Sequence, residues 1–78
     1  MSLFGGIKAS TVVGITELGV HDVENAQGYT DRYRFMAVLK DRGSGTLSDI
    51  ARRTNIQIQD AIRLFKELER EQKVRKIG

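Results

Sequence analysis

The spacing of apolar residues predicts a chain of four helices between two strands. Helices are predicted at about 17–27, 30–42, 48–54 and 58–72. In the first, the second and the last of these stretches, apolar residues recur at the spacing of a helix with one inward face. Residues 10–16 are instead rich in β-branched side chains, and residues 73–77 alternate between polar and apolar, so both are predicted to be strands. Residues 1–9 contain Gly5-Gly6 and show little periodicity. We expect them to form a flexible arm before a single domain at 10–78.

Residues suited to helix ends fall at the expected boundaries. Thr16, Thr30 and Ser48 each precede a helical stretch and carry a hydroxyl that can accept a hydrogen bond from a free amide of the first turn. Gly28 can end the first helix in a left-handed conformation, and the segment Gly43-Ser44-Gly45 is expected to stop the second. Thr54-Asn55 is expected to end the third helix after about two turns. These boundaries predict short connections and a compact helical core.

The inward faces of the predicted helices supply that core. The first helix has only a weak apolar stripe of Leu18, Val20 or His21, Val23 and Ala26, whereas the second presents a broad face of Tyr33, Phe35, Met36, Val38 and Leu39. The last helix carries Ala61, Leu64, Phe65 and Leu68 on one side. The sequence contains no cysteine and one histidine, so disulfides, a zinc site and bound cofactors are not expected, and the core must be held by apolar packing. The sequence shows neither a bilayer-spanning stretch nor a signal peptide, and we expect a cytoplasmic protein.

Charge is divided unequally along the chain. Residues 1–28 carry one basic residue against three acidic ones, whereas residues 29–78 carry 12 basic residues against seven acidic ones. A basic half of this kind favours a polyanionic partner, although solvated surfaces can have the same composition.

The segment Thr46–Glu69 resembles the winged helix-turn-helix superfamily, including repressors of the MarR and ArsR types. The resemblance rests on Ile50-Ala51 in a short helix, Ile56 in a tight turn, and apolar Ala61, Phe65 and Leu68 in a longer helix, followed by Val74. It implies an α+β fold, mainly α, with three to four helices, a helix-turn-helix at about 48–72 and a small two-stranded antiparallel wing. It also implies a transcriptional regulator that binds double-stranded DNA, with the helix at 58–72 in the major groove.

The same resemblance implies roles for individual side chains. Gln57, Gln59 and Arg63 are candidates for contacts with base edges, since glutamine suits adenine and arginine suits guanine. The candidates for phosphate contacts are Arg52, Arg53 and Lys66 on the helices and Lys73, Arg75 and Lys76 on the wing. Arg63 could instead pair with Glu67, and the adjacent arginines could simply be solvated. Asp60 would repel phosphate.

Two features depart from the winged-helix pattern. Gln72 stands where the family commonly has glycine, and no strand follows residues 73–77 to pair with them. One resolution is that residues 12–16 return as the missing antiparallel partner. Ile15-Thr16-Glu17-Leu18-Gly19 also looks like the stretch that follows the wing in MarR-type proteins, as though the order of segments had been rearranged.

The sequence is also compatible with other functions and assemblies. A homodimer would pair two recognition helices across DNA half-sites. Alternatively, Ile58 and Ile62 could form a protein-protein interface, because they lie toward the side of the helix that should face the groove. An enzyme is not expected, since neither catalytic cysteine nor a second histidine is present, and the glycine-rich segments lack the lysine of a phosphate-binding loop.

Overall fold

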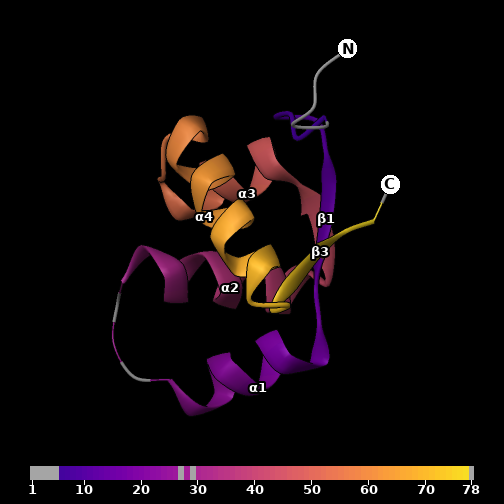
Figure 1. Cartoon of the computed structure of the whole chain (residues 1–78). Helices are drawn as coiled ribbons and strands as arrows, with labels where there is room; N and C mark the ends of the chain where they lie inside the picture. Colours follow the sequence, from indigo (N-terminus) through magenta and orange to yellow (C-terminus); the bar gives the residue numbers. More distant parts are fainter. Residues whose placement is uncertain (1–5, 27, 29, 78) are drawn as a thin grey trace.

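The described residues form a small α+β domain, mainly helical, with four helices and one three-stranded antiparallel sheet. The computed structural model describes residues 6–26, 28 and 30–77. Along the chain the elements are β1 (Val12–Ile15), α1 (Glu17–Asn25), α2 (Asp31–Arg42), β2 (Ser44–Thr46), α3 (Leu47–Thr54), α4 (Ile58–Arg70) and β3 (Val74–Lys76) (Figure 1). The predicted helices and terminal strands are all present, and α4 ends two residues earlier than expected.

The sheet has the order β2-β1-β3, so the first strand of the chain lies at its centre. Val13 pairs with Gly45 on one side and with Lys76 on the other. The predicted pairing between residues 12–16 and 73–77 is therefore confirmed. The expectation of a two-stranded sheet was wrong, because the residues before α3 form a strand that occupies the second edge of β1.

The core lies between the helices and the inner face of the sheet. Its largest fully buried side chains are Phe35, Phe65, Met36, Leu39, Leu47, Ile50, Leu68, Val13 and Val74. Three residues predicted for the inward faces, Tyr33, Val38 and Leu64, are only half-buried at its margin. The predicted α2 and α4 faces thus supply five of these nine side chains, and the sheet and α3 supply the others.

The prediction of a weak apolar stripe on α1 was only partly correct. Val23 is buried, but Leu18 is exposed. The residue that faces inward at the start of α1 is Gly19, where a Cβ atom would lie 2.1 Å from the carbonyl oxygen of Lys73. Because adjacent helical residues point about 100° apart, placing Gly19 against this backbone turns Leu18 toward solvent.

Side-chain caps begin the first three helices. The Thr16 and Thr30 hydroxyls accept hydrogen bonds from the Gly19 and Tyr33 amides, as predicted. For α3 the cap is Thr46, which accepts from the Asp49 amide, and the prediction of Ser48 was wrong. The helix begins at Leu47, one residue before Ser48, so the Ser48 side chain lies too late to take the capping position.

Left-handed residues end three of the helices. Gly43, with φ 86°, follows α2 as predicted, and Asn55, with φ 59°, follows α3. Gly28 does not cap α1, which ends at Asn25 with an extended Ala26 as its cap. After α4, Gln72 takes φ 64°, and the Gln72 and Lys73 amides bond back to the Glu69 and Leu68 carbonyls. Gln72 thus adopts the backbone conformation that the glycine expected there would favour.

Residues 6–9 are attached to the domain. Ile7 packs against the core, and the Ala9 carbonyl accepts a hydrogen bond of 2.9 Å from the Ser48 amide. The rest of the predicted flexible arm, residues 1–5, lies outside the described residues. The described segment before β1 is therefore attached to the start of α3.

Candidate nucleic-acid interface

Two separate helices, α3 and α4, pack together across a tight turn. The Ile56 amide donates to the Ala51 carbonyl at 2.9 Å, and the Asn55 amide donates to the Arg52 carbonyl at 3.3 Å. This is the hydrogen-bond pattern with which a left-handed residue ends a helix, and asparagine tolerates that conformation better than most residues. Ile56, in this turn, is buried. The direction in which α4 leaves α3 is therefore fixed by local backbone bonds and by one apolar anchor.

Polar and basic side chains follow one exposed face of α4. The exposed residues of this face, which we call the α4 outer face, are Gln57, Gln59, Arg63, Lys66 and Arg70. From Gln59 onward they are spaced by four, three and four positions, which keeps them on one side of a helix. The Arg63 side chain is 69% exposed and pairs with Asp60 one turn before it, rather than with Glu67. Arg70, which the sequence reasoning missed, extends this face by one more turn and could have been found from its spacing to Lys66.

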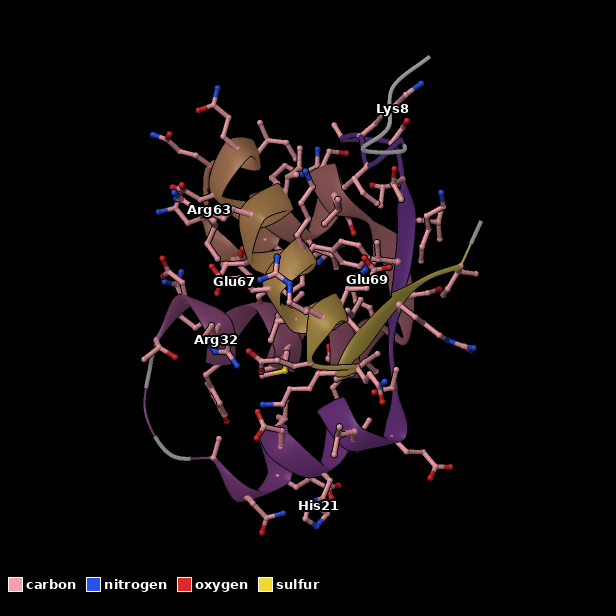
Figure 2. All side chains as sticks on the ribbon, viewed as in Figure 1. Lys8, His21, Arg32, Arg63, Glu67 and Glu69 are labelled. Carbon is pink, nitrogen blue, oxygen red and sulfur yellow. The ribbon has the colours of Figure 1, made fainter. Side chains whose placement is uncertain are left out.

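Two acidic residues of α4 and the following turn are bound by basic side chains from elsewhere. The Arg32 guanidinium donates two hydrogen bonds to the Glu71 carboxylate, at 2.7 and 3.2 Å, and lies 3.7 Å from Glu67 (Figure 2). These bonds, with a second contribution from Lys73, lower the pKa of Glu71 to about 2. The Glu71 hydrogen bond also raises the pKa of Arg32. The negative charge of this side is therefore compensated within the domain.

Lys73 also neutralises acidic side chains within the domain. Its ammonium lies 3.1 Å from Glu71 and 3.4 Å from Asp22 of α1, and its side chain is only 20% exposed. We therefore leave Lys73 out of the candidate interface, although its position after α4 made it a candidate for phosphate contact. Arg75 and Lys76 are exposed on β3, which lies beside β1 and away from the amino-terminal half of α4 (Figure 1).

A second basic group surrounds Asp49 of α3. The Asp49 carboxylate lies 3.0 Å from Arg52, 3.2 Å from Arg53 and 3.0 Å from Arg42 at the end of α2. The hydrogen bonds from Arg52 and Arg53, together with the charge of Arg42, lower the pKa of Asp49. Three guanidinium groups around one carboxylate leave an excess of positive charge at the junction of α2 and α3. Arg42 was not among the sequence candidates, because only the tertiary fold brings the end of α2 against α3.

Ile58 and Ile62 do not form an open apolar patch on α4. Both are half-buried and pack against the core. Among the described residues, the exposed large apolar side chains are Leu18 on α1 and Ile77 after β3. The surface proposed for the alternative protein interface is therefore largely used within the domain.

The remaining candidate chemistry is sparse. Within the described residues, His, Cys, Asp and Glu side chains nowhere form a group of three that could hold a metal ion, and His21 is exposed beside Asn25. None of the described helices is long and apolar enough to cross a membrane. No protein-family model, curated protein or solved structure matches the chain.

Proposed function

We propose that this protein binds double-stranded DNA by placing α4 in the major groove. The observation that carries the proposal is the difference between the basic and the acidic side chains of α4 and the turn after it. The α4 outer face exposes Lys66, Arg70, two glutamines and Arg63, which pairs with Asp60 on the same helix. The neighbouring Glu67 and Glu71 lie against Arg32 of α2, whereas Glu69 is exposed. A major groove of B-DNA admits one helix, and its phosphates favour a face with this charge.

The strand order supports a winged helix-turn-helix with a rearranged order of segments. Helices α3 and α4 form the helix-turn-helix, and β3 follows α4 as the first strand of the wing. Its partner β1 carries Ile15 at the end of the strand and leads into Thr16-Glu17-Leu18-Gly19, the stretch that resembles the one after a wing. In this proposal β1 supplies from the start of the chain the strand that normally follows the wing.

Individual roles follow from position along α4. Gln57, Gln59 and Arg63 belong to the first turns and are proposed to contact base edges. Arg63 would have to leave Asp60, but an exposed ion pair of this kind is worth only about 0 to 1 kcal/mol. Phosphate contacts are proposed for Arg52, Arg53, Lys66, Arg70, Arg75 and Lys76. A regulator that pairs two such domains would place their α4 helices about one DNA turn apart.

The proposal is tested by titrating fluorescein-labelled duplex DNA from the upstream region of the gene, followed by anisotropy at about 50 and 200 mM salt. The doubly substituted Lys66→Ala, Arg70→Ala protein should bind more weakly at low salt. Its slope of log affinity against log salt should be shallower by about 1.8, or about 0.9 for each phosphate lost.

The matched control removes positive charge from another surface. Lys40 of α2 pairs with Glu24 of α1 at 4.0 Å, outside the α4 outer face. Lys40→Ala should therefore leave the salt slope close to that of the wild type. The proposal fails if the wild-type protein shows no salt-dependent binding at micromolar concentration. If Lys40→Ala lowered the salt slope as much as the α4 substitutions do, binding would depend on net charge alone. That result would also contradict the role of α4.

A further inference from the structure

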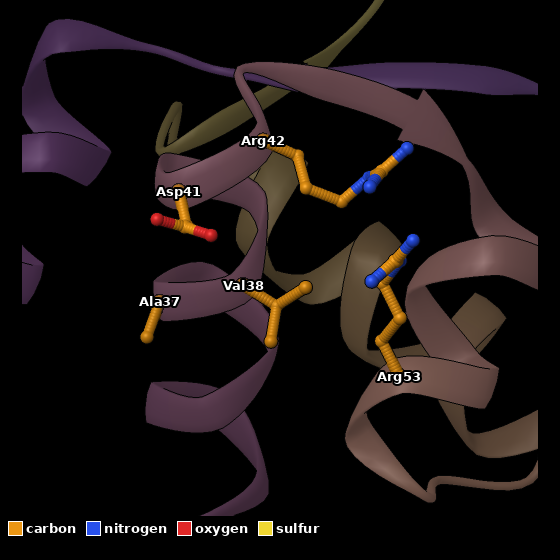
Figure 3. A pocket seen from close by; sticks show the side chains of 5 residues that line it. All are labelled: Ala37, Val38, Asp41, Arg42 and Arg53. Atoms are coloured by element: carbon orange, nitrogen blue, oxygen red, sulfur yellow. The ribbon is translucent and has the colours of Figure 1, made fainter.

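A cleft with two arginines opens between α2 and α3. It has a volume of about 350 Å³, and its lining residues are Ala37, Val38, Asp41, Arg42 and Arg53. Figure 3 shows the Arg42 and Arg53 side chains extending toward each other across the cleft, with Val38 between their helices. We call this site the arginine cleft.

The two guanidinium groups are held in place by one oxygen atom. Arg42 Nε and Arg53 Nε lie 3.0 and 3.2 Å from Oδ2 of Asp49, whose other oxygen binds Arg52. With the Nε atoms turned toward Asp49, the terminal nitrogens of both groups are available for a ligand. Asp49 thus sets the orientation of both arginines.

This arrangement fits a phosphate group. A phosphate has several acceptor oxygens, and guanidinium groups donate to them in pairs with a fixed geometry. Val38 and Ala37 give the cleft an apolar side, which reduces competition from water. Asp41, the acidic residue of the lining, lies on the opposite side of Val38 from Arg53 in Figure 3.

The accessibility of the site favours the backbone of a polymer. The Arg42 and Arg53 side chains are 36% and 50% exposed, and Arg52, on the same carboxylate, is 81% exposed. Positive charge therefore continues out of the cleft along α3, toward the turn that leads to α4. We propose, building on the DNA-binding function above, that the arginine cleft holds one phosphate of the DNA backbone. Arg42 is then a DNA-binding residue, and Asp49 is the residue that positions it.

The first test separates a fixed guanidinium pair from simple positive charge. Arg42→Ala and Arg42→Lys should both weaken DNA binding, by about tenfold for alanine, because lysine keeps the charge but cannot donate as a planar fork. The salt slope should become shallower by about 0.9 in Arg42→Ala, and by the same amount in the Arg42→Ala, Arg53→Ala double variant, because both arginines hold a single phosphate. Wild-type affinity in Arg42→Lys, or additive slopes in the double variant, would overturn the proposal.

The second test uses two substitutions that change the net charge equally. Asp49→Asn and Asp41→Asn each remove one negative charge from the same region. If attraction depends on charge alone, both should strengthen DNA binding. The proposal expects Asp41→Asn to bind as well as or better than the wild type, and Asp49→Asn to bind several-fold more weakly because its arginines lose their orientation. Tighter binding in Asp49→Asn would overturn the positioning role, provided that circular dichroism shows an unchanged helix content.

A third measurement keeps the cleft and the DNA-binding function distinguishable. Titration of the free protein with inorganic phosphate, followed by the Arg Nε–Hε signals in NMR spectra, should shift the signals of Arg42 and Arg53, and Arg42→Ala should abolish the Arg53 shift. Shifts without any DNA binding would refute the proposed function and the DNA source of the phosphate, while supporting a phosphate site. DNA binding with neither shifts nor a changed slope in Arg42→Ala would overturn the cleft and leave α4 as the interface.

Discussion

Replacement of Gly19 by alanine should destabilise the protein, although alanine is the better helix former. Gly19 lies in the first turn of α1 and packs against the α4–β3 turn. A Cβ atom there would lie 2.1 Å from the Lys73 carbonyl oxygen and 2.7 Å from the Ile15 side chain. The Lys73 oxygen is part of the backbone and already accepts a hydrogen bond from the Thr16 amide. It cannot move aside as the end of a side chain could.

The magnitude follows from opposing contributions to the free energy of unfolding. Alanine in place of glycine within a helix contributes about 1 kcal/mol of stability. Restoring an ordinary contact requires a backbone shift of more than about 1 Å, and overpacking of this kind costs about 1 to 3 kcal/mol. Loss of the Thr16 hydrogen bond would add about 1 kcal/mol. We expect a net loss of about 1 to 3 kcal/mol, which lowers Tm by roughly 5 to 20 °C for a domain of this size.

Thermal and urea unfolding followed by circular dichroism measure this change. Gly45→Ala is the control, because a Cβ atom at Gly45 would meet its nearest neighbours at 3.6 Å, an ordinary contact. Its stability should lie within about 0.5 kcal/mol of the wild type. The test is the sign of the change that Gly19→Ala causes in the free energy of unfolding. A stabilised Gly19→Ala protein would show that α1 does not dock against the Lys73 backbone.

Two further predictions concern charge and capping. Because the pKa of Glu71 is lowered to about 2, its contribution to stability is present above the ordinary value of 4.5 and is lost as the pH falls from 4.5 toward 2. Glu71→Gln should therefore reduce the loss of stability over that range in acid unfolding curves, and an unchanged pH dependence would contradict the ion pair with Arg32. Thr46→Ala should destabilise the protein by about 1 kcal/mol because it removes the α3 cap, whereas Ser48→Ala should have an effect within about 0.5 kcal/mol. A larger loss in Ser48→Ala, measured by urea unfolding, would restore the cap expected from the sequence.

Local patterns in the sequence were sufficient for the helices and most of their ends. The spacing of Phe35, Leu39, Phe65 and Leu68 identified two inward faces, because a helix repeats at short range and each face must find an apolar neighbour. Two of the three threonine or serine caps were correct for a similar reason, since a capping hydroxyl acts only within its own turn. The predicted cap Ser48 was wrong because Thr46, two residues earlier, takes the capping position. Both residues carry a hydroxyl that could cap a helix, and the local sequence does not distinguish them.

The tertiary structure decided what distant segments do to one another. The sequence could not show that β1 takes the centre of the sheet, because strand partners are chosen by packing across the whole chain. The fold also separates similar basic residues into different roles: Lys73 is bound by Asp22 and Glu71, whereas Arg42 joins Arg53 on Asp49. Whether a charged side chain can bind a ligand depends on the charged groups within a few ångströms of it. The sequence alone determined which residues could bind a polyanion, and only the folded chain determined which of them are free to do so.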